Sequence, residues 1–272
     1  MTMSSTNLIS VITPVYNAGE FLKAAWYSLR SQSHSNWEWL VIDDGSSDGC
    51  TSFLNDLGDD RVRLFKQGNQ GVSAARNVGL NHMKGSFFCF LDADDLLPIE
   101  SLISRLRVLE DKGVHFADGA TERFVDDPEK TWSRWIPSYR GEPTQRLLAI
   151  DDTCFFGNTW LIRREPNIEY SFNLGMTHSE DLLFYLSICQ GKKLDFTEQT
   201  VLLYRKVEGS AMTDLAGLEK GYMQLVSELS ELGYSADQRK ITRAKARSIM
   251  WKSWLKAGKP LRALQSQMGR WE

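Results

Sequence analysis

The chain has 272 residues and a formal net charge of −3, with 42% hydrophobic and 25% charged residues. This composition is ordinary for a globular protein, and the length suits one large α/β domain with an appended piece, or two small domains. The slightly acidic balance argues against nucleic acid as a partner. No apolar run is long enough to cross a bilayer, and residues 1–7 lack the basic and apolar segments of a signal peptide.

The first hundred residues alternate strand and helix signals in a βαβ rhythm, which predicts an α/β fold with a mainly parallel sheet. β-rich segments end in turns, and the segments between them carry apolar residues at helical spacing. Strands are expected at residues 8–15, 37–42, 62–65 and 87–91, and helices at 21–31, 53–57 and 72–83.

After residue 109 the rhythm weakens. Residues 118–139 are polar, whereas residues 152–163 are apolar and are expected to return the chain to the sheet. A helix is predicted at 179–190 and a short strand at 201–204. From residue 215 helical residues dominate, which predicts a separate helical appendage.

Polar clusters follow three of the predicted strands: Tyr16-Asn17, Asp43-Asp44, and Asp92 to Asp95. In a doubly wound parallel sheet the carboxyl ends of the strands lie on one edge, where ligands bind. We therefore expect the three clusters to meet at one site. The alternative for each of them is an ordinary turn, and for Asp43-Asp44 a turn that leads into a helix cap.

The last of these clusters follows an apolar run of strand length, Phe87 to Leu91. Three carboxylates within four residues repel one another, and an unpaired buried carboxylate is costly. This pattern predicts a bound cation, for which Mg²⁺ or Mn²⁺ with phosphate oxygens in its shell is suitable. The alternative is an Asp-rich turn that caps a helix starting near Pro98.

The four cysteines are widely spaced, which excludes the usual zinc patterns. Cys89 lies inside an apolar run and is best explained as a small core residue. We therefore expect a reduced, cytoplasmic protein, which could lie at the inner face of the membrane. The cysteines are Cys50, Cys89, Cys154 and Cys189.

Five segments occur in order along the chain: VITPVYN (11–17), WLVIDDGSSD (39–48), GVSAARNVG (71–79), FLDADD (90–95) and SEDL (179–182). Together they resemble family 2 glycosyltransferases of the bacterial surface-polysaccharide type, whose members share the GT-A fold. The resemblance is dense over residues 8–100 and thinner to about residue 212. It implies a Rossmann-like GT-A catalytic domain at 1–214, with a nucleotide-binding half at 1–100 and an acceptor-binding half at 101–214, followed by a helical region at 215–272.

The resemblance implies a UDP-sugar as the donor. Asp44 would accept a hydrogen bond from uracil N3–H, which cytosine does not offer. Arg76 lies in a helix that begins after a Gly-rich loop, and both the helix start and the guanidinium suit an anion; the alternative is a solvated surface arginine. The implied nucleotide-binding residues are Thr13, Pro14, Val15, Tyr16, Asn17, Asp44, Arg76, Asp92, Ala93 and Asp94.

Asp92-Ala93-Asp94 matches the D-x-D motif of the family. By this resemblance Asp94 would bind Mn²⁺ or Mg²⁺ directly, and Asp92 would reach the ribose or a metal-bound water. The ion would neutralise the diphosphate and so stabilise the leaving group. Asp95 is expected to cap the next helix.

Glu180-Asp181 resembles the acidic pair that supplies the catalytic base of an inverting transfer. Asp181 would deprotonate the acceptor hydroxyl as it attacks the anomeric carbon. A compatible alternative has Ser179 as the N-cap, with two acids complementing the helix dipole. A helix N-terminus would lower the pKa of Asp181, so we expect an ionised but weak base.

Tyr204-Arg205 and Ser210 resemble a family segment near the diphosphate that often reads Y-R-x-H. Here no histidine follows, so Arg205 or Lys206 is expected to replace that contact. In the acceptor half, large aromatic residues could stack on sugars, although core packing is the alternative. The candidate acceptor residues are Trp132, Trp135, Trp160 and His178, the last as an acceptor-site or structural residue.

Residues 239–262 carry nine Lys and Arg side chains, with tryptophans interleaved, and no acid occurs from 240 to 267. A basic amphipathic helix with tryptophans is typical of contact with an anionic membrane surface. The alternative is a helix that docks on the catalytic domain and exposes a solvated basic face.

Together these residues imply a metal-dependent, inverting glycosyltransferase that moves a sugar from a UDP-sugar to a carbohydrate or lipid-linked glycan, in polysaccharide, lipopolysaccharide or capsule biosynthesis. One rival class is a sugar nucleotidylyltransferase, but Thr13 to Asn17 stands where that class carries a Gly-rich, basic loop. The other is a noncatalytic carbohydrate- or nucleotide-binding protein, against which the intact Asp92, Asp94 and Asp181 argue.

Overall fold

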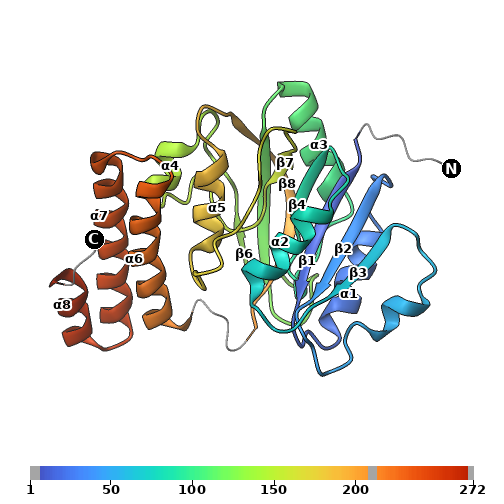
Figure 1. The fold of residues 1–272 in the computed structure, drawn as a ribbon, viewed down its shortest axis with the longest axis horizontal. Helices are drawn as coiled ribbons and strands as arrows, with labels where there is room; N and C mark the ends of the chain where they lie inside the picture. The colour runs from blue at the N-terminus through green and yellow to red at the C-terminus, as the bar shows by residue number, and fades with distance from the viewer. Residues whose placement is uncertain (1–6, 208–212, 269–272) are drawn as a thin grey trace.

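The computed structural model describes residues 7–207 and 213–268; the N-terminal segment 1–6, residues 208–212 with Ser210, and residues 269–272 lie outside it. A central sheet carries helices on both faces, and three further helices extend from one end of it (Figure 1). The strands are β1 (Ile9–Val15), β2 (Trp37–Asp43), β3 (Val62–Lys66), β4 (Phe87–Phe90), β5 (Phe116–Phe124), β6 (Ser133–Trp135), β7 (Leu161–Arg163) and β8 (Leu194–Arg205). The helices are α1 (Phe21–Arg30), η1 (a 3₁₀ helix, Ser52–Asp56), α2 (Val72–His82), α3 (Ser101–Lys112), α4 (Thr144–Leu148), α5 (Glu180–Ile188), α6 (Leu215–Glu231), α7 (Ala236–Lys256) and α8 (Pro260–Met268).

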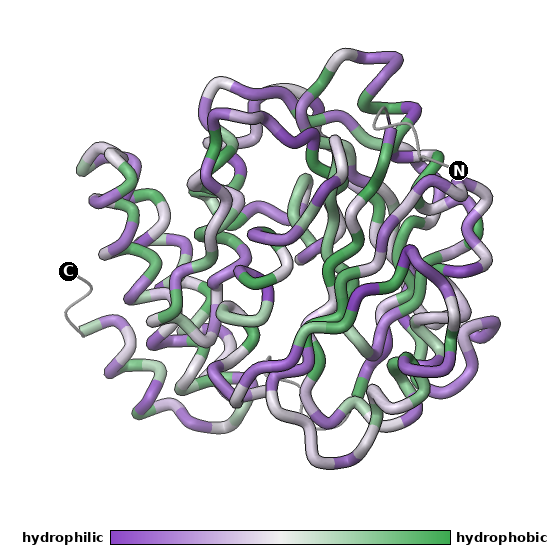
Figure 2. The backbone as a smooth tube through the Cα atoms, turned by 45° about the vertical axis from the view of Figure 1, so that its right-hand side comes forward, coloured by the Kyte–Doolittle hydropathy of each residue, from purple (hydrophilic) through white to green (hydrophobic). Residues whose placement is uncertain are grey.

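The first half of the sheet is parallel, with the strand order β3-β2-β1-β4. Val11 of β1 packs toward α1 and α3, whereas its neighbour Ile12 packs toward α2 and α5. Successive side chains of a strand point to opposite faces, so a strand covered by helices on both faces is apolar throughout. Figure 2 shows these apolar strands at the centre of the molecule. The predicted parallel half is confirmed.

The second half of the sheet is mixed. β7 pairs antiparallel with both β4 and β5, so the predicted return of residues 152–163 to the sheet is confirmed. β5 and the first part of β8 are strands where the sequence pattern predicts none. The pattern fails in β5 because the buried side chains Asp118 and Thr121 interrupt its apolar run. In β8 it fails because residues 197–199 are polar and partly exposed.

Helix α2 lies close against the sheet at Gly79. A Cβ atom at this position would collide with Ile12 of β1 and come within 3.1 Å of Ile42 of β2. The glycine thus permits the close helix–strand approach that fixes the position of α2. Arg76 and Asn77 are carried on the same helix, so their positions are fixed with it.

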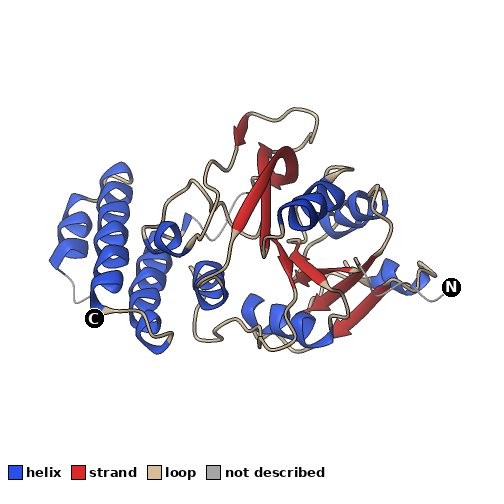
Figure 3. Cartoon of the chain, turned by 90° about the horizontal axis from the view of Figure 1, so that it is seen from above, coloured by secondary structure: helices blue, strands red, loops and turns tan. Residues whose placement is uncertain are grey.

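The C-terminal helices α6, α7 and α8 lie side by side at one end of the sheet (Figure 3). They are packed on the rest of the protein, because Leu225, Met250 and Trp254 belong to the same apolar cluster as Ile12 of β1. Thr242 of α7 also donates a hydrogen bond to the carbonyl oxygen of Leu148. The alternative in which the basic helix docks on the catalytic part is therefore observed.

The cysteines and the lengths of the helices bear on two further expectations, a reduced protein and the lack of a membrane-spanning segment. The four cysteines are buried and unbonded to one another. Within residues 7–207 and 213–268, the helices lack the combination of length and apolar composition that crossing a membrane requires.

Candidate active site

A cleft of about 760 Å³ opens at the carboxyl ends of β1, β2 and β4. The loops after these strands form one wall, and the segment leading into α5, together with α6, forms the other. The three polar clusters of the sequence therefore do meet. The cleft is lined by these predicted residues: Pro14, Val15, Tyr16, Asn17, Asp44, Arg76, Asp92, Ala93, Asp94, His178, Glu180 and Asp181.

Arg76 joins the two walls of the cleft. Its guanidinium is almost fully buried and donates from Nη2 to Asp92 Oδ1 at 3.0 Å and from Nη1 to Glu180 Oε1 at 3.1 Å. The rings of Phe90 and Phe172 lie beside it. Burial by itself lowers the pKa of Arg76, but the two carboxylates raise it overall. The alternative of a solvated surface arginine is thus wrong.

Asp181 is the second residue of α5, directly after the glutamate that Arg76 holds. Its Oδ1 accepts a hydrogen bond from the N–H of Leu182 at 2.7 Å. Burial, and next the charge of Glu180, raise the pKa of Asp181 to about 7. The expectation that the helix N-terminus lowers this pKa is wrong, because desolvation outweighs the helix dipole. A carboxylate that titrates near neutral pH is suited to proton abstraction.

The three aspartates after β4 have different environments. Asp92 is partly exposed and paired with Arg76. Burial and the neighbouring Asp92 raise the pKa of Asp94. Asp95 is buried, and its Oδ1 accepts a hydrogen bond from the backbone N–H of Arg205 at 2.8 Å. The prediction that Asp95 caps the next helix is wrong, because α3 begins later and Asp95 instead joins the β4 loop to β8.

Asp92 and Asp94 are suitable ligands for a divalent ion. In the described parts of the chain, no three acidic, histidine or cysteine side chains are grouped as a ready-made metal site. Mg²⁺ does not require such a group, because it is usually bound by one or two carboxylates, several waters and substrate phosphates. Burial and the charge of Asp92 raise the pKa of Asp94 although Arg205 lies nearby, and a bound divalent cation would favour its ionised form. The residues therefore fit Mg²⁺ or Mn²⁺ completed by a diphosphate.

Asp44 holds the loop that precedes α2. It accepts hydrogen bonds from Gln67 Nε2 at 2.7 Å and from the backbone N–H groups of Gln70 and Gly71, both at 2.8 Å. A carboxylate offers about four acceptor positions, so one remains for a ligand. Asp44 also lines the cleft, and its contact with a nucleobase stays a prediction.

Thr13 does not face the cleft, contrary to the prediction. Its side chain is fully buried, and its Oγ1 accepts a hydrogen bond from the indole N–H of Trp39 at 2.8 Å. Asn17, four residues later, has a left-handed backbone with φ 49° and accepts a hydrogen bond from the N–H of Ser47. The loops after β1 and β2 are thus tied together, which fixes the edge of the cleft.

Asn77 clamps the segment that leads to the acidic pair. Its Oδ1 accepts from the N–H of Phe172 at 2.7 Å, and its Nδ2 donates to the carbonyl oxygen of the same residue at 2.9 Å. Phe172 is buried and stacks on Phe184 of α5 at a centroid distance of 4.3 Å. Helix α2 therefore positions α5 as well as Arg76.

Asn77→Ala is expected to lower the free energy of unfolding by about 1–3 kcal/mol, because it leaves both backbone groups of buried Phe172 without partners. Thermal unfolding of the variant measures the change. Asn81→Ala, an exposed asparagine on the same helix, is the matched control. Equal melting temperatures for the two variants would contradict the clamp.

The residues just before α5 are held by α6. Ser179 occupies the N-cap position, but in a left-handed conformation with φ 61° and without a capping bond from its side chain. His178 packs against Gly221 of α6, where a Cβ atom would lie 2.6 Å from both the Cβ and the carbonyl oxygen of His178. The absent side chain at Gly221 thus sets the path of the chain into Asp181.

Gly221→Ala is expected to destabilise the protein by about 1–3 kcal/mol through overpacking, although alanine is ordinarily the better helix residue. Displacement of His178 is also expected to lower kcat, since Asp181 lies three residues further along. Melting temperature and kcat are measured beside Ser227→Ala, an exposed control on α6. A higher melting temperature with unchanged kcat would refute this contact.

The tryptophans that were predicted to contact the acceptor sugar do not line the cleft in the described structure. Trp160 is fully buried beside Phe116 and Tyr185, so its assignment to the acceptor groove is wrong. Trp132 and Trp135 lie outside the cleft lining. Trp135 instead packs at 5.4 Å behind Phe156, which does line the cleft. The lining residues that the sequence pattern does not single out include Phe155, Phe156, Leu218 and Tyr222.

Arg205 and Lys206 also lie away from the cleft lining of the described residues. The guanidinium of Arg205 donates from Nε to the carbonyl oxygen of Asp94 at 2.9 Å and from Nη1 to that of Val125. Lys206 lies over the ring of Trp132. Arg205 therefore fixes the aspartate loop from behind, and the expected direct contact of either side chain with a diphosphate is not supported.

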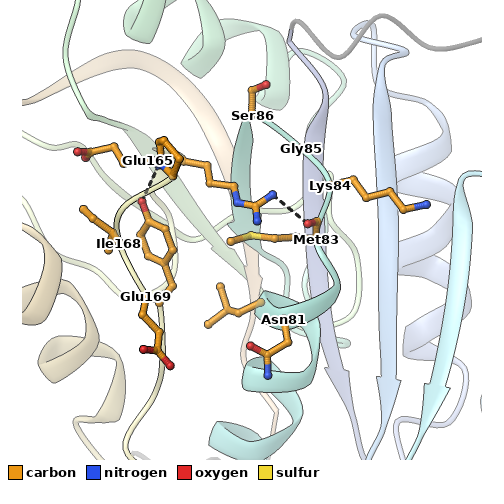
Figure 4. A pocket seen from close by; sticks show the side chains of 12 residues that line it. Asn81, Met83, Lys84, Gly85, Ser86, Glu165, Ile168 and Glu169 are labelled. Carbon is orange, nitrogen blue, oxygen red and sulfur yellow. Dashed lines mark hydrogen bonds between the residues drawn. The ribbon is translucent and has the colours of Figure 1, made fainter.

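A second hollow, of about 600 Å³, lies at the opposite end of β4 (Figure 4). Arg164 donates to the carbonyl oxygen of Met83 at 3.0 Å, and the N–H of Glu165 donates to the hydroxyl of Tyr170. Glu165 is paired with Lys192 at 2.6 Å. These polar groups hold the loop after β7 against α2, which is a structural role.

Solved structures of similar shape define the class of this fold. Staphylococcus aureus TarS 1–349 in complex with UDP-GlcNAc superposes with a TM-score of 0.71 at 18% identity, over 88% of this chain and 71% of that one. The mannosyltransferase PcManGT from Pyrobaculum calidifontis, in complex with GDP-Man and Mn²⁺, gives a TM-score of 0.62 at 16% identity, over 98% and 76%. The fold is the α/β GT-A type with C-terminal helices.

The sequence relatives define the family. The profile of Glycosyl transferase family 2 matches residues 10–171. The UDP-Glc:alpha-D-GlcNAc-diphosphoundecaprenol beta-1,3-glucosyltransferase WfgD of Escherichia coli is 34% identical over 197 residues, 69% of this chain and 72% of that protein. The chain belongs to glycosyltransferase family 2.

Other relatives match over shorter segments. The putative teichuronic acid biosynthesis glycosyltransferase TuaG of Bacillus subtilis is 32% identical over 135 residues, 45% of this chain. This match spans 54% of the length of TuaG. A separate match, over 105 residues, spans 42% of the length of an uncharacterized glycosyltransferase from Haemophilus influenzae.

Proposed function

We propose that this protein transfers a sugar from a UDP-sugar to a hydroxyl group of a carbohydrate or lipid-linked glycan, with inversion at the anomeric carbon, in the synthesis of a bacterial surface polysaccharide. The observation that carries the proposal is the arrangement around Arg76, which joins Asp92 on one wall of the cleft to Glu180 on the other. The name of WfgD, which includes a UDP-sugar and a lipid-linked acceptor, supports this choice of substrates. A cytoplasmic location at the inner face of the membrane is part of the proposal.

The donor lies along the first wall in this proposal. Tyr16 and Asn17 flank the nucleobase and ribose, and Asp44 accepts from uracil N3–H at its remaining acceptor position. The ties between the loops after β1 and β2 favour a preformed pocket, which reduces the entropy lost when the nucleotide binds.

Asp94 would bind a Mg²⁺ or Mn²⁺ ion directly, and Asp92 would reach the ribose or a metal-bound water. When bound, this ion supplies positive charge to the diphosphate leaving group. Arg76 positions Asp92 and, through Glu180, the opposite wall. Arg205 keeps the aspartate loop in place through the carbonyl oxygen of Asp94.

Asp181 is the proposed base, because Glu180 is already held by Arg76 whereas no ion pair engages Asp181 among the residues described. It takes the proton of the acceptor hydroxyl while that oxygen attacks the anomeric carbon. Glu180 is a positioning residue in this scheme: it raises the pKa of its neighbour and fixes the start of α5. Phe156 and Tyr222, which both line the cleft, supply apolar surface for the acceptor sugar.

A donor screen tests the proposed reaction. The nucleoside diphosphate that is released, UDP from several UDP-sugars or GDP from GDP-mannose, is measured with Mn²⁺, with Mg²⁺ and with a chelator, in the presence of glycan acceptors. The proposal requires release from a UDP-sugar that depends on both metal and acceptor. Release that persists in the chelator, or a preference for GDP-mannose, would contradict it.

The raised pKa of Asp181 predicts how the reaction depends on pH. The base works only when ionised, so kcat/KM is expected to fall as the pH drops below about 7, by about tenfold per pH unit. A pH profile of kcat/KM measures this, because that ratio reports the free enzyme. A profile that stays flat down to about pH 5 would exclude a base with this pKa.

A further inference from the structure

Helix α8 is packed with its small residues inward and its large apolar residues outward. Ala263 and Ser266 are buried against α7, with exposed fractions of 0% and 3%. Leu261, Leu264 and Met268 are 75%, 51% and 85% exposed. A helix on a protein surface ordinarily buries its large apolar side chains. The reversed arrangement leaves an outer stripe of Leu261, Leu264 and Met268.

The stripe forms one continuous face. At about 100° per residue its three side chains fall within about 60° of one another, opposite to Ala263 and Ser266. Gln267 Nε2 donates to the carbonyl oxygen of Arg247 at 2.9 Å, which fixes the rotation of α8 on α7. Figure 1 places α8 at the end of the molecule farthest from the sheet. The stripe is thus held outward by the packing of the helix.

Positive charge lies beside the N-terminal end of this stripe. Residues 236–268 contain nine Lys and Arg and a single acid, Asp237, in a chain whose net charge is −3. Three of these cations, Lys256, Lys259 and Arg262, are exposed at the turn into α8 and along its first turn. We call Lys256, Lys259 and Arg262 the basic collar.

We infer that the outer stripe and the basic collar dock this protein on an anionic phospholipid surface. An exposed apolar helix face flanked by Lys and Arg inserts shallowly into the lipid interface, while the cations attract anionic headgroups. This inference assigns a surface of the protein to the membrane location of the proposed function, but it does not depend on the proposed sugar transfer.

A second copy of this chain is a poorer occupant. In a two-fold symmetric dimer the patch would meet itself, which would bring the like charges of the basic collar together. Stable protein interfaces also bury about 1,200–2,000 Å² with about 20–30 residues on each side, whereas the stripe has three apolar side chains. A lipid surface requires neither self-complementarity nor a large area.

Co-sedimentation of the full chain with vesicles tests the inference. Vesicles of phosphatidylglycerol are compared with vesicles of phosphatidylcholine, at low and high salt. The variants are Leu261→Ser with Leu264→Ser, and Lys256→Glu with Lys259→Glu. Their matched controls are Ile99→Ser, an apolar residue that is 61% exposed, and Lys23→Glu with Lys112→Glu, two exposed lysines. Near-UV circular dichroism and UDP binding verify that each variant is folded.

The wild type is expected to bind phosphatidylglycerol vesicles and to be released by salt. Each double variant of the stripe or the collar is expected to lower the binding constant about tenfold or more, and the controls to leave it unchanged. Failure of the wild type to bind, or equal binding by the stripe variant, would overturn the inference. So would self-association that is lost in the stripe variant while vesicle binding is kept.

Discussion

Asp181→Asn is expected to reduce sugar transfer by about 10²–10⁴-fold while UDP binding is retained. The amide has nearly the same shape as the carboxylate but cannot accept the proton of the acceptor hydroxyl. The Oδ1 contact with the N–H of Leu182 can be kept by the amide oxygen, so the start of α5 is preserved. Transfer is measured with saturating donor and acceptor, and UDP binding by calorimetry.

Two further variants make this result specific. Glu180→Gln removes a charge from the same helix turn, and because Glu180 is paired with Arg76, it is expected to perturb both UDP binding and transfer. Asp60→Asn, an exposed aspartate, serves as the control for the loss of one negative charge. If Asp181→Asn retained transfer close to the wild-type rate, Asp181 would be dismissed as the base.

Asp94→Ala is expected to abolish the dependence of UDP binding on Mn²⁺ or Mg²⁺ and to lower transfer by about a hundredfold or more. Asp94 is the aspartate of the pair that is not held by an ion pair in the described structure, whereas Asp92 is already bonded to Arg76. Calorimetry of UDP binding with and without metal separates loss of the ion from loss of the nucleotide site.

The control for this prediction is Asp60→Ala, which removes a carboxylate far from the cleft. Stability is expected to be kept or improved in Asp94→Ala, because the variant removes a carboxylate that burial and Asp92 destabilise in its charged form. UDP binding by the wild type that does not respond to metal would remove the role proposed for Asp94.

The functional cleft depends on contacts between distant parts of the sequence. Helix α2 contributes Arg76 to the ion pairs and Asn77 to the clamp on Phe172. Helix α6, from the C-terminal region, lines the same cleft with Leu218 and Tyr222 and packs on His178. The C-terminal helices therefore complete the cleft, and the division of the chain at residue 214 stays a proposal.

The parallel half of the sheet and the meeting of its strand ends were predictable from the sequence. β1, β2 and β4 are covered on both faces, so they are mainly apolar, with Ser10, Thr13 and Glu38 as buried exceptions, and the polar clusters at their carboxyl ends stand out. Asp44 and Asp92 therefore fall at the same edge of the sheet through topology alone.

Features that depend on three-dimensional contacts were not predictable in this way. Buried Asp118 masks β5, and Trp160 cannot be distinguished by its type from an aromatic residue in a groove. The pKa of Asp181 is set by burial and by Glu180, which outweigh the helix dipole that the sequence reveals. Likewise, the engagement of Arg205 with backbone carbonyl oxygens requires β8 to lie beside the aspartate loop.

The configuration of the product tests the central claim most directly. The claim is that an acceptor hydroxyl, deprotonated by Asp181, displaces the diphosphate in a single step. Nuclear magnetic resonance of the glycoside formed from a UDP-α-sugar distinguishes the two outcomes. The mechanism predicts a β-linked product, and an α-linked product would contradict it.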